Sequence, residues 1–260
     1  MENTAVFEHK TFGGRLKSML KVDFRRMFTQ PLVYIMLGVS LLMPILILVM
    51  TTMMGGAEGG DMGTFTNVWQ AIGSVSGQSS GMAMDLTTMC NINLIYFLAA
   101  VLVCIFIADD FRSGYAKHLF TVRAKKADYV LSKSLVGFTG GVGMLICYFV
   151  GAMIGGAIAG LPFEAGVGAG AIVCCILSKV FLMVVFVAIF LLMSVIAKQR
   201  LWLSIVGSLA VGMLLFMMIP MMTPLDSTFL NVILCLAGGV LFGAGLGAVS
   251  NVILKKTALV

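Results

Sequence analysis

The chain has 260 residues, of which 60% are hydrophobic and only 11% are charged, and its mean hydropathy is +1.07. A water-soluble domain carries about 25% charged residues, so this composition excludes a soluble globule and indicates a protein that folds in lipid. The net charge of +6 does not indicate nucleic-acid binding, because the basic residues fall between apolar blocks and form no surface interleaved with aromatic residues.

Residues 1–31 are predicted to be a cytoplasmic segment that contains an amphipathic helix. Between residues 15 and 30, apolar side chains recur at helical spacing on one face, and cations lie on the other. Pro31 is expected to end this helix. We expect the helix to lie along the membrane interface, with its cations at the headgroups, either as a simple anchor or with a further function.

Residues 32–260 are predicted to form an all-α domain of six transmembrane helices. Backbone polar groups in lipid must be satisfied within their own segment, so each long apolar run is expected to be a helix. A long outer loop rich in Gly, Ser, Thr and Met, residues 55–88, follows the first span. The expected spans are Leu32–Met54, Met89–Ala108, Leu135–Ala159, a fourth that ends near Ala197, Leu201–Ile219 and Phe229–Leu254.

The charged residues are sorted between the two sides of this predicted domain. Sixteen of the 17 Lys and Arg residues lie in the N-terminal segment or after the second, fourth and sixth expected spans. Cytoplasmic loops are enriched in Lys and Arg, so both termini are expected inside the cell. The opposite loops contain no Lys or Arg and carry Glu58, Asp61, Asp85, Glu164 and Asp226.

Lys179 is the one cation outside this pattern. It lies in an apolar stretch from about Gly166 to Ala197 that is too long for a single perpendicular span. Counting about 20 residues back from Ala197 places Lys179 near the outer interface. We interpret it as a lysine whose ammonium group reaches that interface, and the alternative is a cation that faces a cavity.

The cytoplasmic loop between the second and third expected spans, residues 109–134, is long and basic. Gly114 divides it into two stretches that can form helices, and Arg112 and Lys117 are the expected partners of Asp109 and Asp110. We interpret the loop as a docking surface for a cytoplasmic partner, and the alternative is a solvated connector. Four apolar side chains would form its contact face, the first three at four-residue spacing: Phe111, Tyr115, Leu119 and Phe120.

Glycines at four-residue spacing indicate close packing of helices, because small residues let two backbones approach. The spacing leaves open whether that packing is within one chain or between two. These glycines are Gly151 and Gly155 in the third expected span and Gly239, Gly243 and Gly247 in the sixth.

Several motifs that carry enzyme chemistry are missing from the sequence. It contains no GxxxxGK[ST] or HExxH pattern, and its six cysteines lack CxxC spacing. We therefore expect no enzymatic activity, and we assign no catalytic, cofactor-binding or metal-binding residue to this chain.

Two stretches resemble the membrane subunit, or permease, of ABC-2 type ATP-binding cassette transporters. RLKSMLKVDFRRMFTQPLVYIML is similar to the family's amphipathic elbow helix running into the first span. ADDFRSGYAKHLFTVRAKKADYVLSKSL is similar to the family's pattern of an acidic residue, a glycine, a basic patch and a lysine that opens the third span. In this chain those positions are Asp110, Gly114, Lys117, Arg123 and Lys133.

The resemblance implies a multi-pass protein of the bacterial cell membrane that forms a translocation path for export of a peptide, a lipid, a drug or another small molecule. ATP and Mg would bind a separate ATPase subunit, and a second permease chain would complete a homodimer or a paired heterodimer. Coupling contacts with the ATPase are expected at Asp110, Phe111, Arg112, Gly114, Tyr115, Lys117, Arg123, Lys133, Lys198 and Arg200.

Two other functions fit the sequence. One is a membrane protein of structural or immunity type without a transport cycle. The other is a small secondary transporter, which the lack of carboxylates inside the expected spans disfavours, because ion-coupled transport usually needs such groups in the membrane.

Overall fold

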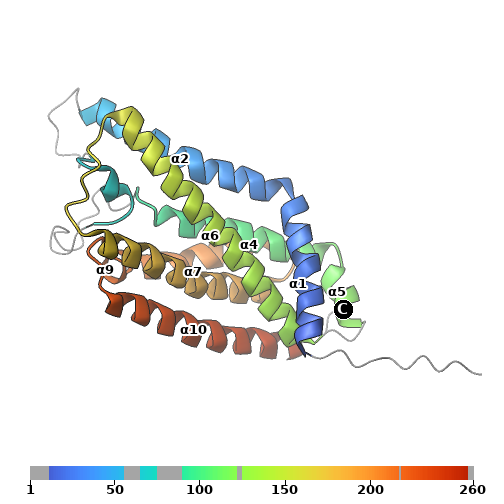
Figure 1. Cartoon of the computed structure of the whole chain (residues 1–260). Coiled ribbons are helices and arrows are strands. Elements are labelled where there is room, and N and C mark those ends of the chain that lie inside the picture. The colour runs from blue at the N-terminus through green and yellow to red at the C-terminus, as the bar shows by residue number, and fades with distance from the viewer. Residues whose placement is uncertain (1–11, 56–64, 75–89, 122–124, 217, 257–260) are drawn as a thin grey trace, which may run out of the picture.

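The computed structural model describes residues 12–55, 65–74, 90–121, 125–216 and 218–256, and this part of the chain contains helices and no strand. The helices lie side by side in one bundle, with α1 crossing its end (Figure 1). Their bounds are α1 Phe12–Thr29, α2 Pro31–Gly55, the 3-10 helix η1 Val68–Ala71, α4 Leu94–Arg112, α5 Tyr115–Thr121, α6 Lys126–Ala159, α7 Ala169–Ala197, α8 Leu201–Phe216, α9 Ile219–Met222 and α10 Phe229–Lys256.

Five of the described helices, namely α2, α4, α6, α7 and α10, are long and apolar enough to cross a membrane. The chain is therefore a polytopic helical membrane protein. The fifth span expected from the sequence, Leu201–Ile219, is shorter in the structure, since α8 ends at Phe216. Its 16 residues rise about 24 Å, less than the ~30 Å of a bilayer's hydrocarbon core, and α9 follows it.

The most buried helices are α4 and α7, which pack against each other at the centre of the bundle. The helix α2 packs along α6, and α10 packs along α7. Both α2 and α10 keep large apolar side chains exposed, for example Leu46 and Leu241, which is the arrangement expected of helices that face lipid.

Two glycines of α6 set its distance from α2. A Cβ atom at Gly151 would lie 2.1 Å from the carbonyl oxygen of Leu41, and one at Gly155 would lie 2.8 Å from the Cα of Ile45. No side chain larger than hydrogen fits these gaps unless the helices separate. The glycines of α10 face other helices of the same chain as well: Gly239 and Gly243 lie against α7, and Gly247 lies near Val130 of α6. The packing that their spacing predicted is thus within one chain.

The boundaries around the expected loop 109–134 differ from the sequence prediction. The helix α4 continues to Arg112 and so contains Asp110, and α6 begins at Lys126, nine residues before the expected start at Leu135. The helical stretches and the break at Gly114 that the sequence predicted are present, as the end of α4, the short helix α5 and the start of α6, but the two long helices extend further into the segment than expected. Its charged residues remain helical because the bundle pairs several of them, as described below.

The two ends of the bundle differ in charge. At one end, which we call the basic end, α1 and α5 lie beside the end of α4 and the start of α6 (Figure 1). There the Lys126 ammonium donates a hydrogen bond of 2.6 Å to the carbonyl oxygen of Leu254, near the end of α10. We call the other end, where η1 and α9 lie, the opposite end.

Candidate functional site: a buried charge cluster at the basic end

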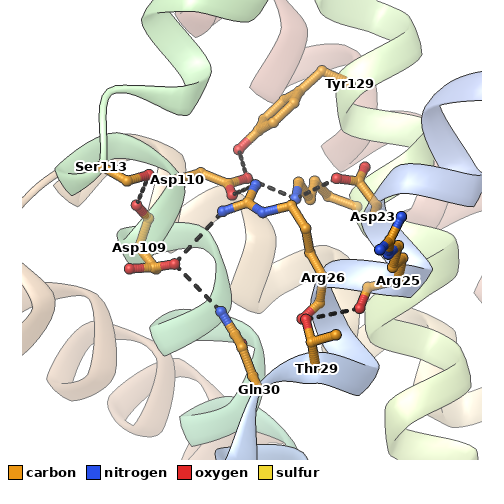
Figure 2. Close-up of polar contacts among 10 residues, drawn as sticks. Asp23, Arg25, Arg26, Thr29, Gln30, Asp109, Asp110, Ser113 and Tyr129 are labelled. Atoms are coloured by element: carbon orange, nitrogen blue, oxygen red, sulfur yellow. Dashed lines mark hydrogen bonds and ion pairs between the residues drawn. The ribbon is translucent and has the colours of Figure 1, made fainter.

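Four charged side chains from three helices meet at the basic end, and we call them the charge cluster. Figure 2 shows three of them, Asp23, Arg26 and Asp110. Asp23 and Arg26 come from α1, Asp110 from α4 and Lys133 from α6. The cluster holds two carboxylates and two cations, so its formal charges balance.

Lys133 is at the centre of the charge cluster. Its ammonium nitrogen lies 2.8 Å from Oδ1 of Asp23 and 2.7 Å from Oδ2 of Asp110, and all three side chains are fully shielded from solvent. The same nitrogen lies 4.0 Å from the ring centroid of Phe106, at a distance typical of a cation–π contact. Removing one partner from a buried ion pair leaves the other charge uncompensated, which destabilises proteins by about 3–5 kcal/mol.

Every carboxylate oxygen of the charge cluster accepts at least one hydrogen bond or ion pair. Ser132 donates its hydroxyl to Oδ2 of Asp23 at 2.6 Å, and Tyr129 donates to Oδ2 of Asp110 at 2.9 Å. Arg26 donates to Oδ1 of Asp110 at 2.6 Å. A fully satisfied polar network of this kind holds its helices in one relative position.

Arg26 also fixes the short helix α5 to the cluster. Its guanidinium carbon lies 4.0 Å from the ring centroid of Tyr115, the first residue of α5. Burial acts to lower the pKa of Arg26, but the charge of Asp110 offsets this, and the net shift is upward. Burial, reinforced by Asp23 and Asp110, raises the pKa of Tyr115. At neutral pH a charged guanidinium therefore lies over a neutral phenol ring.

Among the described residues, the structure brings together three of the predicted coupling residues: Lys133 pairs with Asp110, and its ammonium nitrogen lies 5.6 Å from the ring centroid of Tyr115. The expectation that Arg112 and Lys117 pair with Asp110 is wrong, because both of these side chains are exposed and the partners are Arg26 and Lys133. A carboxylate near the end of a helix opposes the helix dipole unless it is paired, and two cations meet that need here.

The remaining predicted coupling residues are spread over the basic end. Phe111 is only 7% exposed and packs in the core, so it cannot form the contact face that the spacing predicted. Gly114 joins α4 to α5 with φ of +74°, a left-handed conformation that favours glycine. Lys198 and Arg200 are exposed in the turn between α7 and α8. Arg123 lies outside the described residues.

Sequence reasoning missed Asp23 and Arg26. A signal for Asp23 was present, because it follows Leu20 by three residues and precedes Met27 by four, which puts a carboxylate on the apolar face of the helix. An acidic side chain on a face expected to enter lipid requires a buried partner.

Lys179 occupies a second buried polar position, toward the opposite end. It is 2% exposed, so the interpretation that its ammonium reaches the outer interface is wrong. Its nitrogen donates to Oδ1 of Asn93 at 3.0 Å and to the hydroxyl of Thr223 at 2.9 Å, and the Tyr96 hydroxyl donates to the Lys179 carbonyl oxygen at 2.9 Å. The side chain turns inward because α7 is one continuous helix through this region and presents Lys179 to α4.

The fold and the charge cluster define a helical membrane protein in which an amphipathic helix is fastened across one end of the bundle by buried ion pairs. Comparisons with protein-family models, with curated proteins and with solved structures found no match to this chain.

Proposed function

We propose that this chain is the permease subunit of an ABC-2 type transporter, which forms the path for ATP-driven export of a peptide, lipid, drug or other small molecule. The observation that carries the proposal is the charge cluster, because it joins α1, α4, α5 and α6 into one unit at the basic end. A permease driven by a separate ATPase needs such a unit, since the force applied by the ATPase must reach the spans without being lost in a flexible loop.

Two features of the basic end support the proposal. The helix α1 carries a basic face and an apolar face and meets α2 at Pro31, as an elbow helix at the membrane interface would. The helix α5 has its inner side fixed by Tyr115 and Ala116, while Lys117 and His118 are exposed. In this proposal the exposed side of α5, together with Lys198 and Arg200, contacts the ATPase.

The proposal includes a membrane topology. Six spans, with α8 and α9 together forming the fifth, place both termini and the basic end in the cytoplasm of a bacterial cell. A cysteine introduced at Asp226 should then react with an impermeant thiol reagent added outside intact cells, and one at Lys125 should not. Labelling of the Lys125 position from outside would reverse the proposed orientation.

The proposed cycle assigns ATP and Mg to the partner ATPase and a second permease chain, identical or paired, to the other half of the path. Nucleotide-driven closure of the ATPase can shift the permease only if α5 contacts it differently in the two states. The charge cluster would pass that shift to α4 and α6, whose ends it joins.

Co-purification tests the proposal against the alternative of a membrane protein without a transport cycle. The tagged full-length chain is extracted in mild detergent and its partners are identified by mass spectrometry. The proposal expects a stoichiometric subunit with an ATP-binding phosphate loop, and reduced recovery of it from Lys117→Glu but not from the matched variant Lys255→Glu, at the end of α10. Recovery of the chain without any ATPase, from cells that express the chain and its partner proteins at native levels, would contradict the proposal.

A further inference from the structure

Lys179 is a buried cation with no carboxylate among the polar contacts that the described residues make with its ammonium. In the part of the chain that the structure describes, its ammonium contacts two neutral oxygens, those of Asn93 and Thr223, and it takes part in none of the ion pairs. The chain pairs its other fully buried lysine, Lys133, with two carboxylates. Lys179 is thus a buried charge without the compensation that such charges need for structural reasons alone.

Asn93 adds a second donor that lacks an acceptor. Its side chain is 1% exposed, and Nδ2 is buried with no hydrogen-bond partner among the described residues. The orientation of this amide is fixed by chemistry, because the Lys179 ammonium has only hydrogens to donate and must face the oxygen rather than the nitrogen. Nδ2 sits on the same carbon as that oxygen, so its unpaired N–H groups lie beside the ammonium.

The position is built by three segments rather than by one flexible side chain. Asn93 immediately precedes α4, Lys179 lies within α7, and Thr223 follows α9. The segments that carry Asn93 and Thr223 are both tied to residues 65–74, which we call the cap. The backbone N–H of Ile92 donates to Ala71 at 2.8 Å, and that of Leu225 donates to Ser74 at 2.8 Å.

The cap itself is firmly seated. Phe65, Val68, Ala71 and Ile72 are each at most 2% exposed. Trp69 donates its indole N–H to the carbonyl oxygen of Phe163 at 2.7 Å, which fixes the cap to the segment after α6. Asn93 and Thr223 are therefore held in place around the ammonium, as the donors of a binding site must be.

We propose that Lys179 and Asn93 form a binding site for a small anionic group, with a carboxylate as the best match. An ammonium hydrogen and an amide N–H side by side suit the two oxygens of one carboxylate, and the bound charge would compensate Lys179. Binding is measured on the purified chain without an ATPase, so this inference can fail or succeed independently of the proposed transport function.

The test is a thermal unfolding series on the full-length chain in a neutral detergent at constant ionic strength, with acetate, chloride and the neutral isostere acetamide as probes. Acetate near saturation is expected to raise the unfolding temperature of the wild-type chain by at least about 3 °C, because a ligand that binds only the folded state stabilises it. Acetamide should produce no shift. A larger shift for acetate than for chloride identifies a carboxylate site, and equal shifts identify a site for compact anions.

Two variants, each with a matched control, make the outcome decisive. Lys179→Met should lose the acetate shift, and the exposed control Lys255→Met should keep it. Asn93→Asp replaces the unpaired Nδ2 with a carboxylate oxygen and supplies the missing charge from the chain itself. This variant should unfold at a higher temperature than the wild type without acetate and should no longer respond to acetate, whereas Asn91→Asp, also buried but without a contact to Lys179, should unfold at a lower temperature.

The proposal is overturned if acetate produces no shift in the wild-type chain, if acetamide matches it, or if Lys179→Met retains it. It is also overturned if Asn93→Asp is as destabilised as Asn91→Asp. That result would mean that a carboxylate at position 93 compensates no positive charge.

Discussion

Two fully buried lysines in this chain, Lys133 and Lys179, have polar partners of opposite kinds, charged for Lys133 and neutral for Lys179. Lys133 is held between two carboxylates and under the ring of Phe106, and the oxygens of both carboxylates have further donors. Lys179 has two neutral oxygens and, beside them, an amide donor with no described acceptor. The charge of Lys133 is balanced within the chain, and that of Lys179 meets no carboxylate among the described residues.

The difference separates a structural use of buried charge from a binding use. At the basic end the ion pairs connect helices that are far apart in sequence. Removing one partner of a buried pair leaves the other charge unpaired in a low-dielectric interior. Toward the opposite end the same residue type has a neutral environment that is rigid and donor-rich. Measurements on the two sites in the same assay test whether this distinction holds.

Replacing each lysine by methionine should give the largest contrast. Lys133→Met leaves Asp23 and Asp110 without their ammonium and should lower the free energy of unfolding by about 3–5 kcal/mol. Lys179→Met removes an uncompensated charge from an apolar interior and should change it by less than about 1 kcal/mol, or increase it. Both variants would be unfolded with denaturant in mixed micelles, and equal losses would contradict the distinction.

A double-mutant cycle on Arg26 and Asp110 should give the next largest effect. The two side chains are 2.6 Å apart and Asp110 is fully buried, so we expect a coupling energy of about 2 kcal/mol. A cycle on Arg26 and Asp109 is the control, because that contact is 3.6 Å long and Asp109 is 48% exposed. It should give less than about 1 kcal/mol, as exposed pairs do. Similar coupling in both cycles would show that burial does not strengthen the cluster.

Two tyrosine hydroxyls provide a smaller and closely matched comparison. Tyr129→Phe removes a hydrogen bond to the charged carboxylate of Asp110 and should cost about 2 kcal/mol of stability. Tyr96→Phe removes a hydrogen bond to the neutral carbonyl of Lys179 and should cost about 1 kcal/mol. The same unfolding assay measures both. A larger loss of stability for Tyr96→Phe than for Tyr129→Phe would contradict the view that the stronger polar network is at the basic end.

The sequence predicted the membrane helices well because each one depends on local composition. Long apolar runs located α2 and α10 and the C-terminal end of α7 to within a few residues, and the helical spacing of residues 15–30 located α1. Glycine spacing identified the faces of α6 and α10 that approach other helices. These properties are encoded within about 30 residues of chain and need no knowledge of the tertiary fold.

The charge cluster could not be predicted in the same way, since its partners are far apart in sequence. Lys133 and Asp23 are separated by 110 positions, and a count of charges by membrane side assigns both to the basic end without pairing them. The boundary errors have the same cause. The second span was expected to end near Ala108 and the third to begin near Leu135, and the ion pairs of Asp110 and Lys133 lie within the longer helices that the structure shows. Lys179 was misplaced because counting from one end of a long helix says nothing about which neighbour the side chain faces.

In the proposed function, α5 is fixed to the bundle by the charge cluster and is the surface through which an ATPase moves this chain. The most direct measurement is site-specific photo-crosslinking in native membranes, with a photoreactive residue at exposed Lys117 on α5 and, as the control, at exposed Glu164 at the opposite end. We predict that the Lys117 position captures an ATP-binding subunit, that the Glu164 position does not, and that Lys133→Met weakens the capture by loosening the base of α5. Absence of an ATPase adduct at Lys117, or an equal yield at Glu164, would contradict the claim.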